Sequence, residues 1–176
     1  KVKPVLFINK VDRLINELQV TPEDMMSRFQ ETITKVNKLI KQFAPEEFKK
    51  EWQVSVMDGT VAFGSAYHNW GITIPYMKKS GVTMTDIFQY CNDEKQKELA
   101  QAAPVHEVLL DMAVTKLPSP VEAQPYRIPN IWTGDLDSSI GKAMMACDPE
   151  AELAMMITKI WMDPHAGEVA VGRLYS

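Results

Sequence analysis

Cysteine is scarce in this chain of 176 residues: only Cys91 and Cys147 are present, and they lie far apart. A disulfide scaffold needs several cysteines, so this count favours a protein of a reducing compartment. We therefore expect a cytoplasmic location and no disulfide-linked partner. No apolar stretch approaches the roughly 20 residues that a membrane-spanning helix needs. The N-terminus carries no signal-peptide pattern, and we expect no association with a membrane.

Histidine is equally scarce. His68, His106 and His165 show no paired spacing of the kind that metal ligands have, so we predict no metal site. No arrangement of a nucleophile with a histidine and an acid stands out either, and we assign no catalytic residue. The net charge of −4 gives no overall basic character that would argue for nucleic acid as a direct ligand.

The most informative stretch that is present lies near the start of the chain. The apolar run from Val5 to Ile8 predicts a buried β-strand. The run ends in Asn9, Lys10 and, after one further residue, Asp12. In an open α/β sheet, ligands bind just beyond the C-terminal ends of the parallel strands. An amide, an ammonium group and a carboxylate are thus predicted at a ligand-binding edge.

Guanine is the ligand whose chemistry fits these three groups. Its N1–H and 2-amino group are adjacent donors, and the carboxylate of Asp12 can accept from both. Adenine lacks this pair, and a site built to bond such groups rejects an analogue without them by roughly 10⁴-fold or more. The methylene stem of Lys10 can lie along the base, and Asn9 is expected to hold neighbouring loops by hydrogen bonds.

The next segment predicts a crossover between two parallel strands. Thr21 and Pro22 begin a long amphipathic helix that runs to Phe43. The segment from Trp52 to Val56 alternates and predicts a strand, and the run from Val61 to Phe63 predicts a second one. Strands joined by a helical crossover point the same way, so the loop after Phe63 should emerge beside Asn9.

That second loop contains Gly64, Ser65, Ala66 and Tyr67. We predict that backbone N–H groups of Ser65, Ala66 or Tyr67 donate to the O6 atom of guanine. Gly64 would allow the backbone to approach closely. The predicted nucleotide-binding residues are Asn9, Lys10, Asp12, Ser65, Ala66 and Tyr67.

The rest of the chain divides into further segments. Residues 68–103 predict a mostly helical insertion, and Pro104 opens a helix that stops at Leu117. Residues 119–131 predict an extended, proline-rich linker followed by a first strand. In residues 132–176, Asp137 and Ser138 can begin a short helix, and a hairpin follows from Leu153 to Leu174, as is typical of an all-β domain. Both ends of the chain look cut from something longer, and we expect boundaries near 118 and 131.

A family resemblance covers essentially the whole chain. Residues 9–12 and 64–66 resemble the fourth and fifth guanine-binding motifs of translational GTPases. The longer segments 61–66, 117–124 and 163–168, the last followed by 172–174, resemble the elongation factor 2 family in its archaeal form. The resemblance implies an α/β fold. Residues 1–118 would be the C-terminal half of a P-loop GTPase domain with a helical insertion, and 132–176 the first strands of an all-β barrel domain.

The resemblance also implies a function for the parent protein: a ribosomal translocase that binds GTP and GDP with Mg²⁺ and moves tRNA and mRNA on the ribosome. This chain departs from the family pattern because it has no phosphate loop. Gly141-Lys142-Ala143 lacks both the hydroxyl group and the spacing of that motif, and the switch regions are missing too. We expect the chain to be catalytically inactive by itself.

Two alternatives remain open at this point. The chain could be a binding or scaffold module that keeps the fold without a nucleotide site. It could also come from a splicing GTPase that resembles elongation factor 2.

Overall fold

The computed structural model describes residues 2–176. The chain divides into two compact units, Lys1–Leu117 and Pro118–Ser176. We describe each unit by itself.

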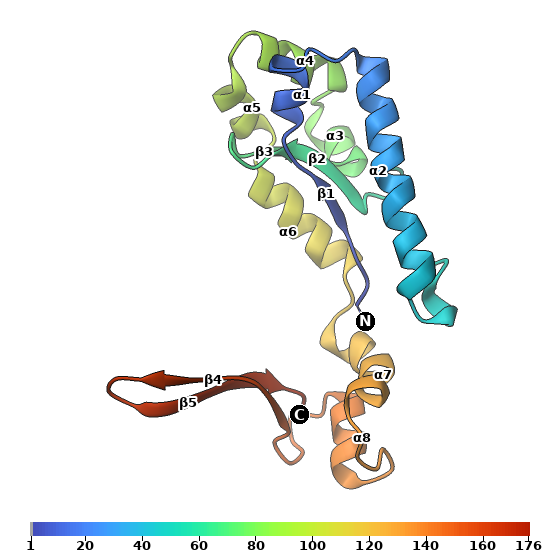
Figure 1. Ribbon diagram of the computed structural model, residues 1–176, viewed down its shortest axis with the longest axis vertical. Helices are drawn as coiled ribbons and strands as arrows, with labels where there is room; N and C mark the ends of the chain where they lie inside the picture. The colour runs from blue at the N-terminus through green and yellow to red at the C-terminus, as the bar shows by residue number, and fades with distance from the viewer. Residues whose placement is uncertain (1) are drawn as a thin grey trace. The chain divides into compact units, whose positions relative to one another are not determined.

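The first unit is built around a small mixed sheet. Within residues 2–117 its strands are β1 (Leu6–Ile8), β2 (Val61–Ser65) and β3 (Trp70–Ile72), in the order β1-β2-β3. The pair β1 and β2 is parallel, whereas β2 and β3 are antiparallel. Helix α2 (Pro22–Phe43) makes the connection between the parallel strands (Figure 1). The predicted crossover is therefore confirmed.

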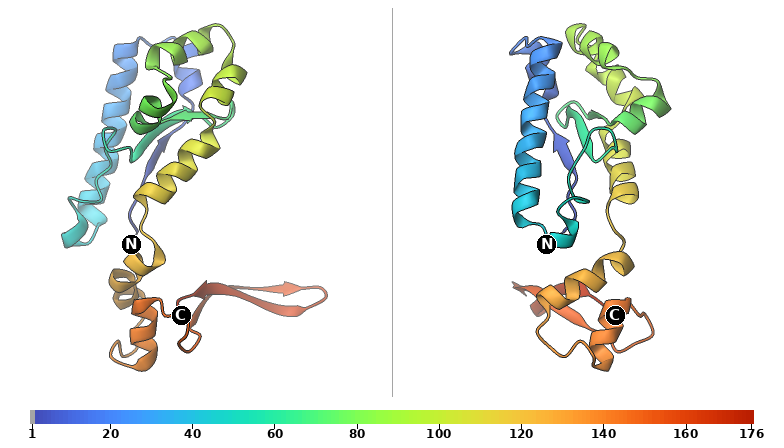
Figure 2. Two further views of the ribbon diagram at one scale, coloured as in Figure 1. Left: turned by 180° about the vertical axis from the view of Figure 1, so that it is seen from behind. Right: turned by 90° about the vertical axis from the view of Figure 1, so that its right-hand side faces the viewer.

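Helices cover both faces of this sheet. Besides α2 they are α1 (Val11–Asn16), α3 (Ile74–Ser80), α4 (Met84–Asn92), α5 (Gln96–Ala102) and α6 (Val105–Lys116), with a short 3-10 turn at Glu46–Phe48. Figure 2 shows α2 and α6 on opposite sides of the sheet. Phe29 of α2 packs on Phe63 of β2 with ring centroids 4.6 Å apart, and Val108 and Met112 of α6 are buried in the same core. None of the helices within residues 2–176 is long and apolar enough to cross a membrane.

The strand predicted from Trp52 to Val56 is wrong. Trp52 and Val54 are buried, as the alternation suggested, but the segment joins no sheet. The side chain of Asn37 on α2 bonds both backbone groups of Val54 instead. Its Nδ2 donates to the Val54 carbonyl at 2.9 Å, and its Oδ1 accepts from the Val54 N–H at 2.8 Å. One amide side chain thus does here what a neighbouring strand would do.

The helical insertion predicted for residues 68–103 needs one correction. It begins with β3, whose Trp70 is fully buried, and only then continues with α3, α4 and α5. The indole N–H of Trp70 donates to Oε1 of Gln96 at 3.0 Å. Strand β3 has only three residues, with Gly71 at the centre, and this pattern is too short to predict a strand from the sequence. These residues form a strand because they pair with β2.

The linker and first strand predicted for residues 119–131 are also wrong, because Pro120–Ile131 is helix α7 of the second unit. Ser119 and Glu122 form a capping box, in which the Ser119 side chain accepts from the Glu122 N–H, and Pro120 occupies the first turn. Proline inside a helix removes a hydrogen bond and clashes with the preceding turn. Helix α7 nevertheless contains Pro125, and the adjacent Gln124 is buried, with its Nε2 donating to the Tyr175 carbonyl at 2.9 Å and to the Met144 carbonyl.

The remaining elements of the second unit follow the predictions. Ser138 caps α8 (Ser139–Ala146) by accepting from the Gly141 N–H at 3.1 Å. Strands β4 (Met155–Asp163) and β5 (Gly167–Leu174) pair antiparallel as the predicted hairpin, drawn in red in Figure 1. Its membership of a β-barrel stays a prediction.

Candidate functional site

The parallel pairing of β1 and β2 brings the two predicted loops together. Ile8 is paired with Phe63, so the residues that follow each strand leave the sheet at the same edge. Oδ1 of Asn9 accepts a hydrogen bond from the backbone N–H of Ala66 at 2.9 Å. The sequence predicted this proximity from the crossover, and the loop-holding hydrogen bond expected of Asn9 is present.

The backbone at Lys10 turns sharply into helix α1. Lys10 has φ 65 and ψ 32, in the left-handed region that residues other than glycine rarely adopt. Oδ1 of Asn9 also accepts from the Lys10 N–H at 2.8 Å, which supports this conformation. Left-handed residues cost of order 1–3 kcal/mol and cluster at functional sites. The turn places Asp12 in the first turn of α1.

Asp12 is the most unusual polar residue of this edge. It is only 8% exposed, and its Oδ1 is buried without a hydrogen-bond partner within residues 2–176. The other oxygen, Oδ2, lies 3.7 Å from Nε2 of His68. A buried acceptor without a partner costs about 1–3 kcal/mol. Such a group suits a site in which a ligand supplies the missing donor.

A cavity of about 360 Å³ opens beside this carboxylate. It is lined by Asn9, Lys10, Asp12, Arg13, Glu17, Ser65, Tyr67 and His68. Five of the six predicted nucleotide-binding residues line it, and the sixth, Ala66, is bonded to its rim through Asn9. The volume falls within the roughly 300–1,000 Å³ that small-molecule sites occupy. Tyr67 is largely exposed at the mouth.

The close backbone approach predicted at Gly64 is to a neighbouring strand. A Cβ atom on Gly64 would lie 2.8 Å from Cα of Gly71 on β3 and would collide with the Trp70 carbonyl. Ser65 is buried beside it, and its Oγ accepts from the His68 N–H at 3.2 Å. Gly64 and Ser65 therefore fix the turn that carries Ala66 and Tyr67.

Three lining residues were not predicted from the sequence. Arg13 lies on α1 and Glu17 caps its C-terminal end four residues later, and Nε of Arg13 donates to Oε1 of Glu17 at 2.8 Å. This hydrogen bond lowers the pKa of Glu17. His68 lies three residues after Ser65, at the end of a turn that only the pairing of β2 with β3 defines. Two features of the sequence could have pointed to these residues. Arg13 and Glu17 have the i, i+4 spacing of an ion pair on a helix, and His68 lies close in sequence to Ser65.

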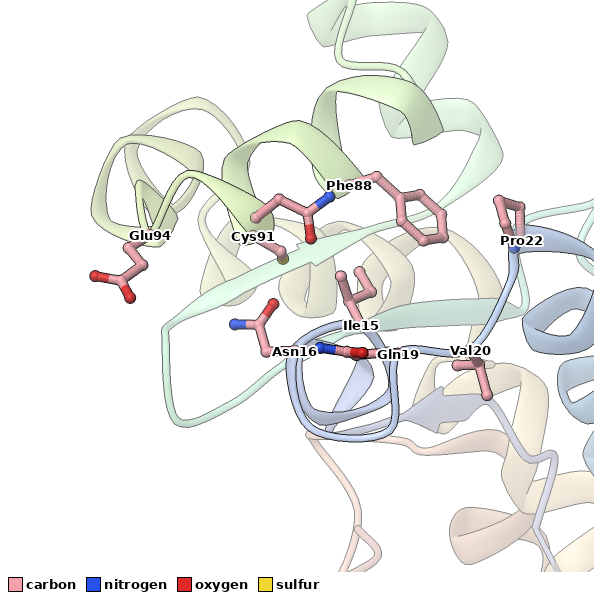
Figure 3. Close-up of a pocket in the computed structure, with 9 residues that line it drawn as sticks. Ile15, Asn16, Gln19, Val20, Pro22, Phe88, Cys91 and Glu94 are labelled. Carbon is pink, nitrogen blue, oxygen red and sulfur yellow. The ribbon is translucent and has the colours of Figure 1, made fainter.

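A second cavity, of about 530 Å³, lies on another side of α1. In Figure 3, Phe88 and Cys91 of α4 face Ile15 and Asn16 of α1 across it. Burial raises the pKa of the Cys91 thiol to about 11, and the negative charge of Asp12 adds to this effect. Helix α1 therefore forms a wall of both cavities. Within residues 2–176 no group of three or more His, Cys, Asp or Glu side chains could hold a metal ion.

Comparison with known proteins identifies the family. Residues 1–119 match the family model described as "Elongation factor Tu GTP binding domain". The chain belongs to this family. The match covers more than half of the sequence, including both loops at the edge of the β1–β2 pair.

Full-length relatives are similar over all 176 residues. The chain is 64% identical to elongation factor 2 of Methanococcus aeolicus and 62% identical to that of Methanocaldococcus jannaschii, and in each case all of the chain matches 24% of the relative. It is 61% identical to elongation factor 2 of Methanopyrus kandleri, where it covers 14%. The chain thus spans about a quarter or less of the length of these curated relatives, which are archaeal translation elongation factors.

Proposed function

We propose that the cavity beside Asp12 binds the guanine base of GTP and GDP and supplies base specificity to a ribosomal translocase. The observation that carries this proposal is the buried Asp12 carboxylate, whose Oδ1 has no partner within residues 2–176 and which lines a cavity of suitable size. Membership of the elongation factor Tu GTP-binding domain family supports a guanine nucleotide as the ligand. The name of the relatives, elongation factor 2, supports a role in translation elongation.

Each residue of the site has a role in this proposal. Asp12 accepts from N1–H and the 2-amino group of guanine, which adenine cannot match. Asn9 holds the two loops in register through the Ala66 N–H. A backbone N–H group of Ser65, Ala66 or Tyr67 donates to O6. The stem of Lys10 covers one face of the ring.

The chemistry of GTP hydrolysis would depend on groups that the 176 residues do not contain. Phosphoryl transfer relies on a phosphate-binding loop and on Mg²⁺ to stabilise the developing charge, and this chain has no G-x-x-x-x-G-K-[ST] motif. The chain would then be the C-terminal half of a GTPase domain with the start of a β-barrel domain. By itself it is expected to be inactive, whereas the whole protein would hydrolyse GTP in the cytoplasm to move tRNA and mRNA on the ribosome.

A chimera tests the base specificity. This chain replaces the matching 176-residue segment of Methanococcus aeolicus elongation factor 2, to which it aligns over its whole length. We expect the chimera to bind GDP at least about 10⁴-fold more tightly than ADP. Asp12→Asn should move the preference from GDP to xanthosine diphosphate, whose C2 carbonyl accepts from the amide. Asp111→Asn, on the exposed side of α6, is the matched control and should change nothing. An Asp12→Asn chimera that still prefers GDP contradicts the proposal.

A titration separates this proposal from a nucleotide-free scaffold. A fluorescent GDP analogue is added to the chimera and to the 176-residue chain. We expect the chimera to bind and the chain alone to bind weakly or not at all, because the base contacts lack the phosphate contacts. A chimera that binds no nucleotide while remaining folded by circular dichroism would favour the scaffold function.

A further inference from the structure

His68 is held in place by the turn between β2 and β3. Ser65 is paired with Trp70 across this turn, so only four residues connect the two strands. The His68 N–H donates to Oγ of the buried Ser65 at 3.2 Å, and Asn69 has a left-handed φ of 60. The backbone of His68 is therefore fixed to the sheet, and its side chain lines the same cavity as Asp12.

The imidazole of His68 stands directly beside the Asp12 carboxylate. Nε2 lies 3.7 Å from Oδ2 of Asp12, which is longer than a hydrogen bond, so the two side chains are neighbours without a direct hydrogen bond. The ring of Tyr67 meets the imidazole edge-on, with centroids 4.8 Å apart and an angle of 88° between the planes. Tyr67 thereby restricts how the imidazole can turn. The His68 side chain is 33% exposed, so it keeps access to the cavity mouth.

Asp12 needs such a neighbour because its own geometry does not fix the carboxylate plane. The terminal torsion of aspartate is broad, with no sharp preference. Oδ1 has no partner within residues 2–176, and Arg13, the next residue on α1, directs its Nε to Glu17. The high pKa of the Cys91 thiol keeps that group neutral at pH 7, so it exerts no strong charge effect on Asp12. Within residues 2–176, His68 is the polar side chain that the structure places 3.7 Å from Oδ2.

We infer that His68 is a positioning residue for base recognition: it orients the Asp12 carboxylate so that both oxygens face the N1–H and the 2-amino group of guanine. The inference rests on the proposed function of the cavity and goes further, since it assigns discrimination between guanine and hypoxanthine to a histidine outside both sequence motifs. Hypoxanthine keeps N1–H and lacks the 2-amino group. A misoriented carboxylate loses the second hydrogen bond first, and guanine then loses its advantage.

The test compares GDP with inosine diphosphate in the chimera. We expect the unmodified chimera to bind GDP more tightly than inosine diphosphate. His68→Phe keeps an aromatic ring against Tyr67 and removes both ring nitrogens. It should reduce the ratio of the two affinities about threefold to tenfold, the value of one hydrogen bond, mainly by weakening GDP. His68→Gln restores a polar group and should recover most of the ratio. His106→Phe, at an exposed position of α6, is the matched control and should leave the ratio unchanged.

The outcomes separate this inference from the proposed function. If His68→Phe weakens GDP and inosine diphosphate equally, or leaves both unchanged, the role of His68 is at most structural and the inference is overturned. If the unmodified chimera fails to prefer GDP over ADP, the proposed function fails first and the inference falls with it.

A nucleotide-free measurement checks the same orientation in the 176-residue chain. The ¹³C resonance of the Asp12 carboxyl group should shift with His68→Phe and shift less with His68→Gln. An Asp12 resonance that is the same in the unmodified chain and the His68→Phe variant overturns the inference.

Discussion

Oδ1 of Asn9 accepts a hydrogen bond from the backbone N–H of Ala66, which lies 57 residues further along the chain. The same oxygen accepts from the N–H of Lys10. One side-chain atom therefore joins the end of β1, the start of α1 and the turn after β2. The edge that carries the candidate site is held together by this atom as well as by the sheet.

Removal of this link should loosen the site before it unfolds the domain. Asn9→Ala leaves two backbone N–H groups without this acceptor, and we expect the free energy of unfolding to fall by about 0.5–1.5 kcal/mol for each bond lost. Hydrogen exchange at the Ala66 amide should accelerate more than exchange in the core of β2. Asn9→Asp keeps an acceptor oxygen and should retain most of the protection. Unchanged exchange at Ala66 in Asn9→Ala would contradict this reading of the hydrogen bond.

Gly64 and Gly71 form a matched pair because they stand opposite each other in β2 and β3. A Cβ atom on Gly64 would meet backbone atoms of β3, whereas one on Gly71 would meet Cγ2 of Val105 at 3.3 Å, which is a movable side chain. We expect Gly64→Ala to cost about 3 kcal/mol or more and Gly71→Ala clearly less. Urea unfolding of both variants measures the difference. Equal losses would show that the two strands can move apart at Gly64.

The side chain of Asn37 forms the hydrogen bonds with the backbone of Val54 that a neighbouring strand would otherwise form. Asn37→Ala removes two partly buried hydrogen bonds and leaves both Val54 backbone groups without these partners. We expect a loss of about 2–3 kcal/mol in unfolding free energy, together with faster hydrogen exchange at Val54. Asn37→Asp keeps the acceptor and loses the donor, so its stability should lie between those of the other two proteins. A variant as stable as the unmodified chain would mean that water replaces the amide without cost.

The Cys91 thiol should make stability depend on pH in the alkaline range. Burial raises its pKa from 9.0 to about 11, so the unfolded chain loses this proton at lower pH than the folded chain does. The neutral thiol therefore contributes to the free energy of unfolding in full below pH 9, and this contribution is lost as the pH rises towards 11. At about 1.4 kcal/mol per pKa unit, it amounts to roughly 2–3 kcal/mol.

The comparison of Cys91→Ala with the unmodified chain measures this contribution. The unfolding free energy of the Cys91→Ala variant should fall less between pH 9 and pH 11 than that of the unmodified chain. In a Cys147→Ser background, iodoacetamide should also modify Cys91 only slowly at pH 8, because the thiolate is rare and the sulfur is buried. Rapid modification under these conditions would refute the raised pKa.

Local sequence was sufficient for those elements that carry their own start and stop signals. Thr21 and Pro22 begin α2, Ser138 begins α8, and the turn at residues 163–167 sets the β4–β5 hairpin. The crossover followed from the order of apolar runs and helix, so the meeting of Asn9 with the loop at Ala66 was predictable as well. The prolines of α7 led to the wrong prediction of an extended linker, whereas the Ser119-x-x-Glu122 capping box correctly indicates the start of a helix.

The sequence by itself determined which groups stand at the edge of the β1–β2 pair, because the order strand, helix, strand and the Asn-Lys-x-Asp spacing are both visible in it. Only the tertiary structure decided their physical state. The Asp12 carboxylate is buried with His68 beside it, and the backbone of Val54 bonds to Asn37 rather than to a neighbouring strand. Such effects depend on burial and on contacts across the fold, and a one-dimensional pattern of polar and apolar residues does not encode which distant side chain will supply a partner.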